Sequence, residues 1–303
     1  MRAEDSVERL VEQLGPLTGA ELQAGTGGEA FASWKAAMLS SRLAVTTVGA
    51  RYLRLDHKVD GFARLSPSIL REFLTYSVVG LAGDTAALDG KAAEVLAHIR
   101  NVSRAKLDLA TGVVAGVSAQ LADGPAAEER FCVFIAGDVV YDMAHDVPRP
   151  ERSTGKMVRG SDLDLVVIVD DAAPEALLRR LDEAIYQQKY RHLINPSARE
   201  EIDYIVKRFD RLRDQARFDT FKKMVACKIL QEGVFLHGSR GLFDAAQALL
   251  DEYGVTTKLA AMEADAARLR RDAEQYLLST DQRVLTGDDL HLFYTTDESE
   301  EFE

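Results

Sequence analysis

Two aspartates stand one residue apart at the start of an apolar segment, "RGSDLDLVVIVD", Arg159 to Asp170. In a β-strand alternate side chains share a face, so Asp162 and Asp164 are expected to point the same way, with Leu163 pointing into a core. Two carboxylates held this close repel each other unless a cation lies between them. Mg²⁺ binds carboxylate oxygens and commonly keeps positions for substrate phosphates. The pair therefore predicts a magnesium site that handles a phosphorylated substrate.

A third acidic candidate lies in a later segment, "EEIDYIVKRF", whose residues alternate as in a strand. Ile202, Tyr204 and Val206 are expected to share one face, with Asp203 on the other. If the two strands are neighbours, three carboxylates gather at one place. The competing interpretation is an acidic turn ahead of an ordinary strand.

The segments around these aspartates are typical of strands and helices in alternation. A strand, "RFCVFIAG", is predicted to end at Gly137, and the polar, proline-containing segment from His145 to Arg159 to be a long loop. One helix is predicted from Pro174, and another, "DQARFDTFKKMVACKILQEG", up to Gly233. "LHGSRG", Leu236 to Gly241, is predicted to be a loop.

The parts that flank this region have a different pattern. From the start to about Leu121, apolar residues recur at the three- and four-residue spacing of helices, as in "EAFASWKAAMLSSRLAVTTVGARYL". Helices are also predicted between Leu242 and about Leu278. The end of the chain, "TTDESEEFE", is an acidic tail expected to be disordered.

Composition limits the classes of protein. The 303 residues include 49 acidic and 37 basic ones, a net charge of −12, which argues against stable binding of duplex DNA. No apolar run is long enough to cross a membrane and the N-terminus lacks the apolar core of a signal peptide, so a cytoplasmic protein is expected. Cys132 and Cys227 are expected to be buried thiols.

The loop ahead of Asp162 is locally basic, with Arg149, Lys156 and Arg159. A polyphosphate site would have this composition, and a solvated basic surface has it as well.

The motifs resemble those of the DNA polymerase β-type nucleotidyltransferase superfamily. They are "FIAG" through Gly137, "GSDLDL" from Gly160, "EIDYIV" around Asp203, and "KILQEGVFLHG" from Lys228. The resemblance covers about 106–253 and implies an α+β fold, with a mixed-sheet nucleotidyltransferase core flanked by helices. The expected parts are a mainly helical N-terminal region (1–105), the core (106–240), C-terminal helices (241–294) and the acidic tail (295–303).

The resemblance implies a reaction and roles for residues. A nucleoside monophosphate would pass from an NTP such as ATP to a hydroxyl of a tRNA end, a protein or a small molecule, with release of pyrophosphate. Asp162, Asp164 and Asp203 would bind two Mg²⁺ ions, or Mn²⁺ in their place, and Asp203 would also help to remove the acceptor's proton. The expected phosphate-binding residues are Gly137, Gly160, Ser161, Lys156, Arg159, Lys222 and Lys223.

Two features depart from that family. Gly137 is followed by Asp138 where the family has a small residue, and the interval from there to Asp162 is about twice the usual length. One alternative is therefore a nucleotidyltransferase fold that has lost catalysis and binds a nucleotide or a partner; another is a toxin or phage-defence enzyme of the same chemistry. Haloacid-dehalogenase-like phosphatases and GT-A glycosyltransferases also carry D-x-D, but after the apolar strand, whereas "LVVIV" follows Asp164 here.

Overall fold

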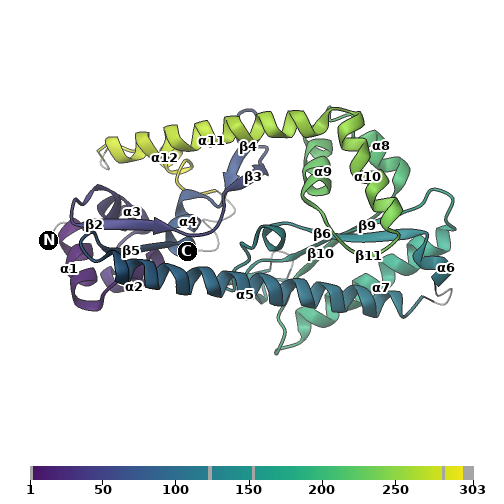
Figure 1. Cartoon of the computed structure of the whole chain (residues 1–303), viewed down its shortest axis with the longest axis horizontal. Helices are drawn as coiled ribbons and strands as arrows, with labels where there is room; N and C mark the ends of the chain where they lie inside the picture. The colour runs from purple at the N-terminus through teal and green to yellow at the C-terminus, as the bar shows by residue number, and fades with distance from the viewer. Residues whose placement is uncertain (1–2, 122–124, 152–153, 282–283, 296–303) are drawn as a thin grey trace. The chain divides into compact units, whose positions relative to one another are not determined.

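The computed structural model describes residues 3–121, 125–151, 154–281 and 284–295. The chain divides into two compact units (Figure 1): unit 1 holds Met1–Arg54, Ala63–Ile99 and Glu263–Glu303, and unit 2 holds Leu55–Phe62 and Arg100–Met262. The predicted α+β class is confirmed, because helices accompany several small sheets, one of them mixed. None of the helices among the described residues combines the length and apolar character that crossing a bilayer requires.

Unit 2 is built on a four-stranded sheet with the order β10-β9-β6-β11. Its strands are β6 (Phe131–Ala136), β9 (Leu163–Val169), β10 (Ile202–Arg208) and β11 (Val234–Gly238). Strand β10 runs parallel to β9, whereas β6 runs antiparallel to both β9 and β11. The sheet is therefore mixed, and the three predicted strands of the resemblance are neighbours in it.

Helices cover both faces of this sheet (Figure 1). Unit 2 contains the helices α6 (Pro125–Glu128), α7 (Glu175–Ile194), α8 (Phe209–Gln215), α9 (Phe221–Glu232) and α10 (Arg240–Glu252), the 3-10 turn η1 (Asp138–Tyr141), and parts of α5 (Thr85–Ser118) and α11 (Val255–Ser279). Apolar residues of α7 and of the second half of α5 (Thr85–Ser118) pack on the face that carries Leu163, Leu165 and Val167. Helices α9 and α10 lie over the opposite face, where Phe134 packs against Phe243. Asp164 alternates with Leu163 and Leu165 and so belongs to the α9 side.

The loop and helix predictions in unit 2 need three corrections. Residues Leu236–Gly238, predicted as loop, belong to β11, which supplies the hydrogen-bonding partner for the edge of the buried strand β6. The long loop contains a short hairpin, β7 (Pro148–Pro150) and β8 (Met157–Arg159). The helix predicted to run up to Gly233 is interrupted between α8 and α9, where buried Phe218 has a φ of 58°. Cys132 and Cys227 are buried free thiols, as predicted.

Unit 1 contains more strand than its sequence pattern predicts. Its helices are α1 (Ala3–Leu14), α2 (Gly19–Thr26), α3 (Ala30–Leu39), α4 (Ile69–Tyr76), the first part of α5, the second part of α11 (Val255–Ser279) and α12 (Gly287–Leu290). Its strands are β1 (Leu17–Thr18), β2 (Leu43–Thr47), β3 (Tyr52–Leu55), β4 (Ala63–Ser66) and β5 (Ser77–Leu81), with β5 between β1 and β2. The segment predicted as one helix from Glu29 to Leu53 turns into a strand at Leu43, where β-branched residues begin. Residues 296–303 of the acidic tail lie outside the described residues.

Helix α3 of unit 1 is packed against the chain's own C-terminal segment. Phe293 contacts both Phe31 and Trp34 through their rings, at centroid distances of 5.1 and 5.2 Å. The ammonium of Lys35 donates to the carbonyl oxygens of Leu277 and Thr280 at the end of α11. The single basic side chain of α3 is thereby used inside unit 1.

Lys207, on β10, provides a test of the burial of this strand. Burial lowers the pKa of its ammonium to about 8, and Arg211 acts in the same direction. Between this pKa and the ordinary value of 10.5 the folded protein binds fewer protons than the unfolded chain, so stability is expected to rise with pH across that window. Lys207→Met removes this buried charge together with the hydrogen bond from the ammonium to the Gln215 side chain at 2.9 Å. The protein should therefore be stabilised at pH 7, by less than the roughly 3 kcal/mol to which the pKa shift corresponds.

The measurement is urea unfolding of both proteins at pH 7 and pH 10. The advantage of Lys207→Met should shrink at the higher pH, whereas exposed Lys222→Met should match wild type at both. If the free energy of unfolding depended on pH equally in wild type and in Lys207→Met, the lowered pKa of Lys207 would be contradicted.

Candidate metal centre

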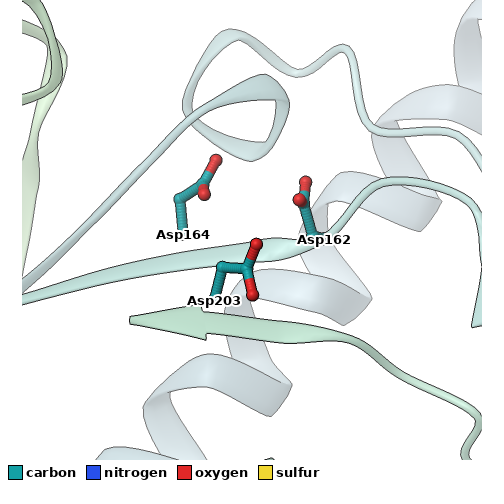
Figure 2. Close-up of side chains that lie close together, drawn as sticks. All are labelled: Asp162, Asp164 and Asp203. Atoms are coloured by element: carbon teal, nitrogen blue, oxygen red, sulfur yellow. The ribbon is translucent and has the colours of Figure 1, made fainter. Parts of the chain in front are cut away.

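Three carboxylates meet at the end of the sheet where β9 and β10 begin. The parallel register sets Asp203 beside Asp164, and Asp162 precedes the first residue of β9. One oxygen from each of the three lies within 4.8 Å of the other two. Figure 2 shows the three side chains grouped, Asp164 from β9, Asp162 from the residue before that strand and Asp203 from the neighbouring strand β10. The structure therefore brings together the three predicted ligand residues, in an arrangement that can hold a metal ion.

Two cations of the chain itself already face this group. Lys189, on α7, contacts Asp203 through its ammonium at 2.7 Å. A guanidinium nitrogen of Arg149, on β7, lies 3.7 Å from Asp162. These cations reduce the repulsion among the carboxylates, and a metal ion bound there has to share the oxygens with them.

Arg149 connects the group to a buried carboxylate. A second guanidinium nitrogen lies 2.8 Å from a carboxylate oxygen of Glu201, and the third donates to the carbonyl oxygen of Gly160 at 2.9 Å. The side chains of Arg149 and Glu201 are only 12% and 6% exposed. Burial raises the pKa of the Glu201 carboxyl, while Arg149 opposes that rise and the charge of Asp162 adds to it. Arg149 thus offsets the negative charges of Asp162 and Glu201, which lie next to each other directly before β9 and β10.

Gly137, the residue directly after β6, lies close to the carboxylate of Asp164. Its φ is +78°, and a Cβ atom at this position would lie 2.4 Å from an oxygen of Asp164. Any side chain here would displace that carboxylate, so the position requires glycine. Gly137 is thus placed beside the triad, and its N–H, predicted to bind a phosphate, donates to Glu232 of α9 at 2.9 Å.

Ser161 and Gly160 shape the turn that leads into the D-x-D pair. The Ser161 hydroxyl donates to Asp138 at 2.9 Å and accepts from the N–H of His145 at 3.2 Å. Gly160 has a φ of +57°, and a Cβ there would lie 1.8 Å from the carbonyl oxygen of His145. Both residues fix the path of the loop beside Asp162. The hydroxyl expected to meet a phosphate is bonded to the carboxylate of Asp138.

A second buried group of charges lies next to Gly137. Glu232 accepts a hydrogen bond from the Tyr141 hydroxyl at 2.9 Å as well as from Gly137, and it forms an ion pair with Lys228 one helical turn earlier. Lys228 also donates to the Tyr141 oxygen at 2.6 Å. The side chains of Lys228 and Glu232 are 8% and 9% exposed. The sequence interpretation missed this group, whose one signal was the four-residue spacing of Lys228 and Glu232.

The predicted phosphate-binding cations lie in different settings. Lys156 and Arg159 are exposed on the hairpin of the long loop, and Arg159 is three residues from Asp162. Lys222 is exposed at the start of α9. Lys223 contacts Asp214 and Asp219, each at 3.0 Å, and these partners raise its pKa. The ammonium of Lys223 is thus used in surface ion pairs.

Comparisons with protein-family models, with curated proteins and with solved structures found no match for this chain.

Proposed function

We propose that unit 2 is a metal-dependent nucleotidyltransferase of the DNA polymerase β type, which moves a nucleoside monophosphate from an NTP to a hydroxyl acceptor and releases pyrophosphate. One observation carries the proposal: at the start of two adjacent parallel strands, one oxygen from each of three carboxylates lies within 4.8 Å of the other two, beside the glycine that follows the neighbouring strand β6. Carboxylate oxygens converging in this way are the ligands that Mg²⁺ and Mn²⁺ use when they also bind substrate phosphates.

Each residue has a role in this proposal. Two Mg²⁺ ions, when bound, would lower the charge on the transferred phosphate and on the leaving pyrophosphate. Asp162 and Asp164 would hold both ions, and Asp203 would complete the coordination on the acceptor side. Because Asp203 is half exposed and faces the same space, it is also the residue placed to accept the acceptor's proton. Lys189 would keep the Asp203 carboxylate in position.

The acceptor classes are a tRNA end, a protein hydroxyl and a small molecule. Incubation of the protein with each labelled NTP and Mg²⁺, with and without total tRNA and lysate, separates these classes by where the label appears. Label on none of them, together with no release of pyrophosphate, would overturn the proposed activity. The Asp203→Ala variant is the negative control.

The second candidate is a fold without catalysis that binds a nucleotide or partner protein. The specific observation in its favour is that the Gly137 N–H and the Ser161 hydroxyl are both bonded to carboxylates, those of Glu232 and Asp138. Calorimetry with Mg²⁺ and NTP distinguishes the two candidates, since binding without pyrophosphate release supports the second. A role as a toxin or in phage defence would involve the same chemistry, and neighbouring genes would reveal it.

The exposed cations of the long loop give a prediction for the enzyme. Lys156→Ala together with Arg159→Ala is expected to reduce transfer at least tenfold, about 1.4 kcal/mol of transition-state stabilisation, because they are the exposed cations nearest Asp162 in the chain. Their exposure means that the melting temperature should stay the same. Initial rates at saturating Mg²⁺ measure the effect.

Lys222→Ala with Lys223→Ala is the matched control. This pair also removes two positive charges from exposed or ion-paired positions, and we expect a smaller loss of rate than with the loop variant. A larger loss from the control pair would move the phosphate-binding role to α9.

A further inference from the structure

We propose that Gly137, Tyr141 and Lys228 form a phosphate-binding position and that the carboxylate of Glu232 is its internal competitor. The inference rests on the proposed function for the identity of the ligand, a triphosphate. It adds two residues that the sequence interpretation did not select, Tyr141 and Lys228, and it makes Glu232 an autoinhibitory group.

The three donors around Glu232 are those that bind phosphate oxygens. A main-chain N–H, a phenolic hydroxyl and an ammonium converge on the two oxygens of one carboxylate, from Gly137, Tyr141 and Lys228. The set combines one full positive charge with two neutral donors, and the side chains of Lys228 and Glu232 are almost fully buried. Main-chain N–H groups, tyrosine hydroxyls and lysine ammonium groups all donate hydrogen bonds to phosphate oxygens.

The position of Glu232 in its helix shows how strongly these donors attract an anion. Glu232 is the last residue of α9, where the helix dipole favours cations and disfavours a carboxylate. The charge is nevertheless buried there, so the hydrogen bonds and Lys228 outweigh the dipole. Because Glu232 is the last residue of α9, a change of its side-chain rotamer would break the contacts with Gly137, Tyr141 and Lys228 but no backbone hydrogen bond of the helix.

The anion position adjoins the proposed metal ligands. The main-chain N–H that donates to Glu232 belongs to Gly137. A Cβ atom built on Gly137 would lie 2.4 Å from a carboxylate oxygen of Asp164. A phosphate held by these donors would therefore lie next to the triad, as the leaving pyrophosphate of the proposed reaction requires. Glu232 and that phosphate cannot occupy the same donors, so the carboxylate has to leave before the phosphate binds.

Binding of inorganic tripolyphosphate to Glu232→Gln, measured by calorimetry without metal, tests the inference. The amide keeps the size of the side chain but removes its charge. We expect at least tenfold tighter binding than in wild type, and an increase in melting temperature on adding tripolyphosphate that is larger than in wild type. Lys228→Met added to Glu232→Gln should abolish the gain, because it removes the cation that the anion would bind.

Glu200→Gln is the matched control. It breaks another buried pair of unit 2, in which the Lys106 ammonium lies 2.6 Å from Glu200 and the side chains are 5% and 13% exposed. This variant should bind tripolyphosphate as wild type does. Should Glu232→Gln fail to fold, Glu232→Asp retains the charge but shortens the reach toward Gly137, and it should show a smaller gain.

The outcomes separate this inference from the proposed function. The role of Glu232 as an internal competitor would be overturned if Glu232→Gln bound tripolyphosphate no more tightly than wild type. It would also be overturned if Glu200→Gln gained as much affinity as Glu232→Gln. Both conclusions hold even if label transfer is observed. A gain confined to the Glu232 variants, with no label transfer by any variant, would leave the phosphate position standing and overturn the nucleotidyltransferase. If wild type transfers label, Glu232→Gln should do so at a lower NTP concentration.

Discussion

Asp164→Asn is expected to abolish nucleotidyl transfer, with a loss of about a thousandfold or more, or roughly 4 kcal/mol of transition-state stabilisation. Asparagine has the size of aspartate but lacks the charge that binds a metal ion. Asp164 lies next to Asp203 in the sheet register and so close to Gly137 that a Cβ atom there would displace its carboxylate. The same loss is expected for Asp162→Asn, and rates of pyrophosphate release measure both.

Stability should change in the opposite direction to activity. The three carboxylates repel one another, so removing one charge should leave the melting temperature unchanged or raise it. Mg²⁺ with NTP should raise the melting temperature of wild type and have no such effect on Asp164→Asn. Asp210→Asn is the matched control, because Asp210 is 80% exposed on α8, and it should behave as wild type in both measurements. Activity retained by the Asp162→Asn and Asp164→Asn double variant would show that the triad is not the active site.

The sheet and its carboxylates were predictable because they depend on local periodicity. In β9 a period of two places Asp164 on the face opposite buried Leu163 and Leu165, and in β10 it places Asp203 opposite buried Ile202. Only the neighbour relation of the strands, a long-range property, had to be assumed, and the register that pairs Asp203 with Asp164 confirms it. The predicted mixed sheet follows from the antiparallel position of β6.

The groups around the triad could not be predicted in the same way. Lys189 comes from a helix, Arg149 from a loop hairpin and Glu232 from the end of α9, and their side chains meet only in the folded chain. No sequence spacing relates such residues to Asp162. Strand β11 was missed for a similar reason, since its five residues form a strand by pairing with β6, and the turn residues that follow dominate the local pattern.

Strands of unit 1 were missed because helix and strand patterns overlap in short apolar runs. Strand β5 is only five residues long, all but the last of them buried, and follows α4 without a break, so apolar spacing does not separate the two elements. Strand β2 is likewise short and follows α3 closely. The resulting three-stranded sheet depends on β5 lying between β1 and β2, which are separated by two helices in the chain.

Loss of Arg149 is expected to have the largest effect on stability. Arg149→Met should lower the free energy of unfolding at pH 7 by about 3 to 5 kcal/mol, because it leaves the buried carboxylate of Glu201 without its cation. Burial and Asp162 already raise the pKa of Glu201, and without Arg149 it should rise further. A raised pKa in the folded state penalises the ionised form, so the penalty develops as the pH rises above the ordinary value of 4.5. The loss of stability should accordingly be largest at neutral pH and shrink as the pH falls toward that value.

A second substitution, Glu201→Gln, tests whether the uncompensated charge of Glu201 causes this loss of stability. In the Arg149→Met background it removes the buried charge at constant size, so most of the lost stability should return and the dependence on pH should disappear. Arg213→Met, at a position where the arginine side chain is 49% exposed and paired with surface aspartates, should cost well under about 1 kcal/mol. Urea unfolding at pH 5 and pH 7 measures all four proteins. If the double variant were as unstable as Arg149→Met alone, the contact of Arg149 with the Gly160 carbonyl, and not its charge, would be what holds the loop in place beside Asp162.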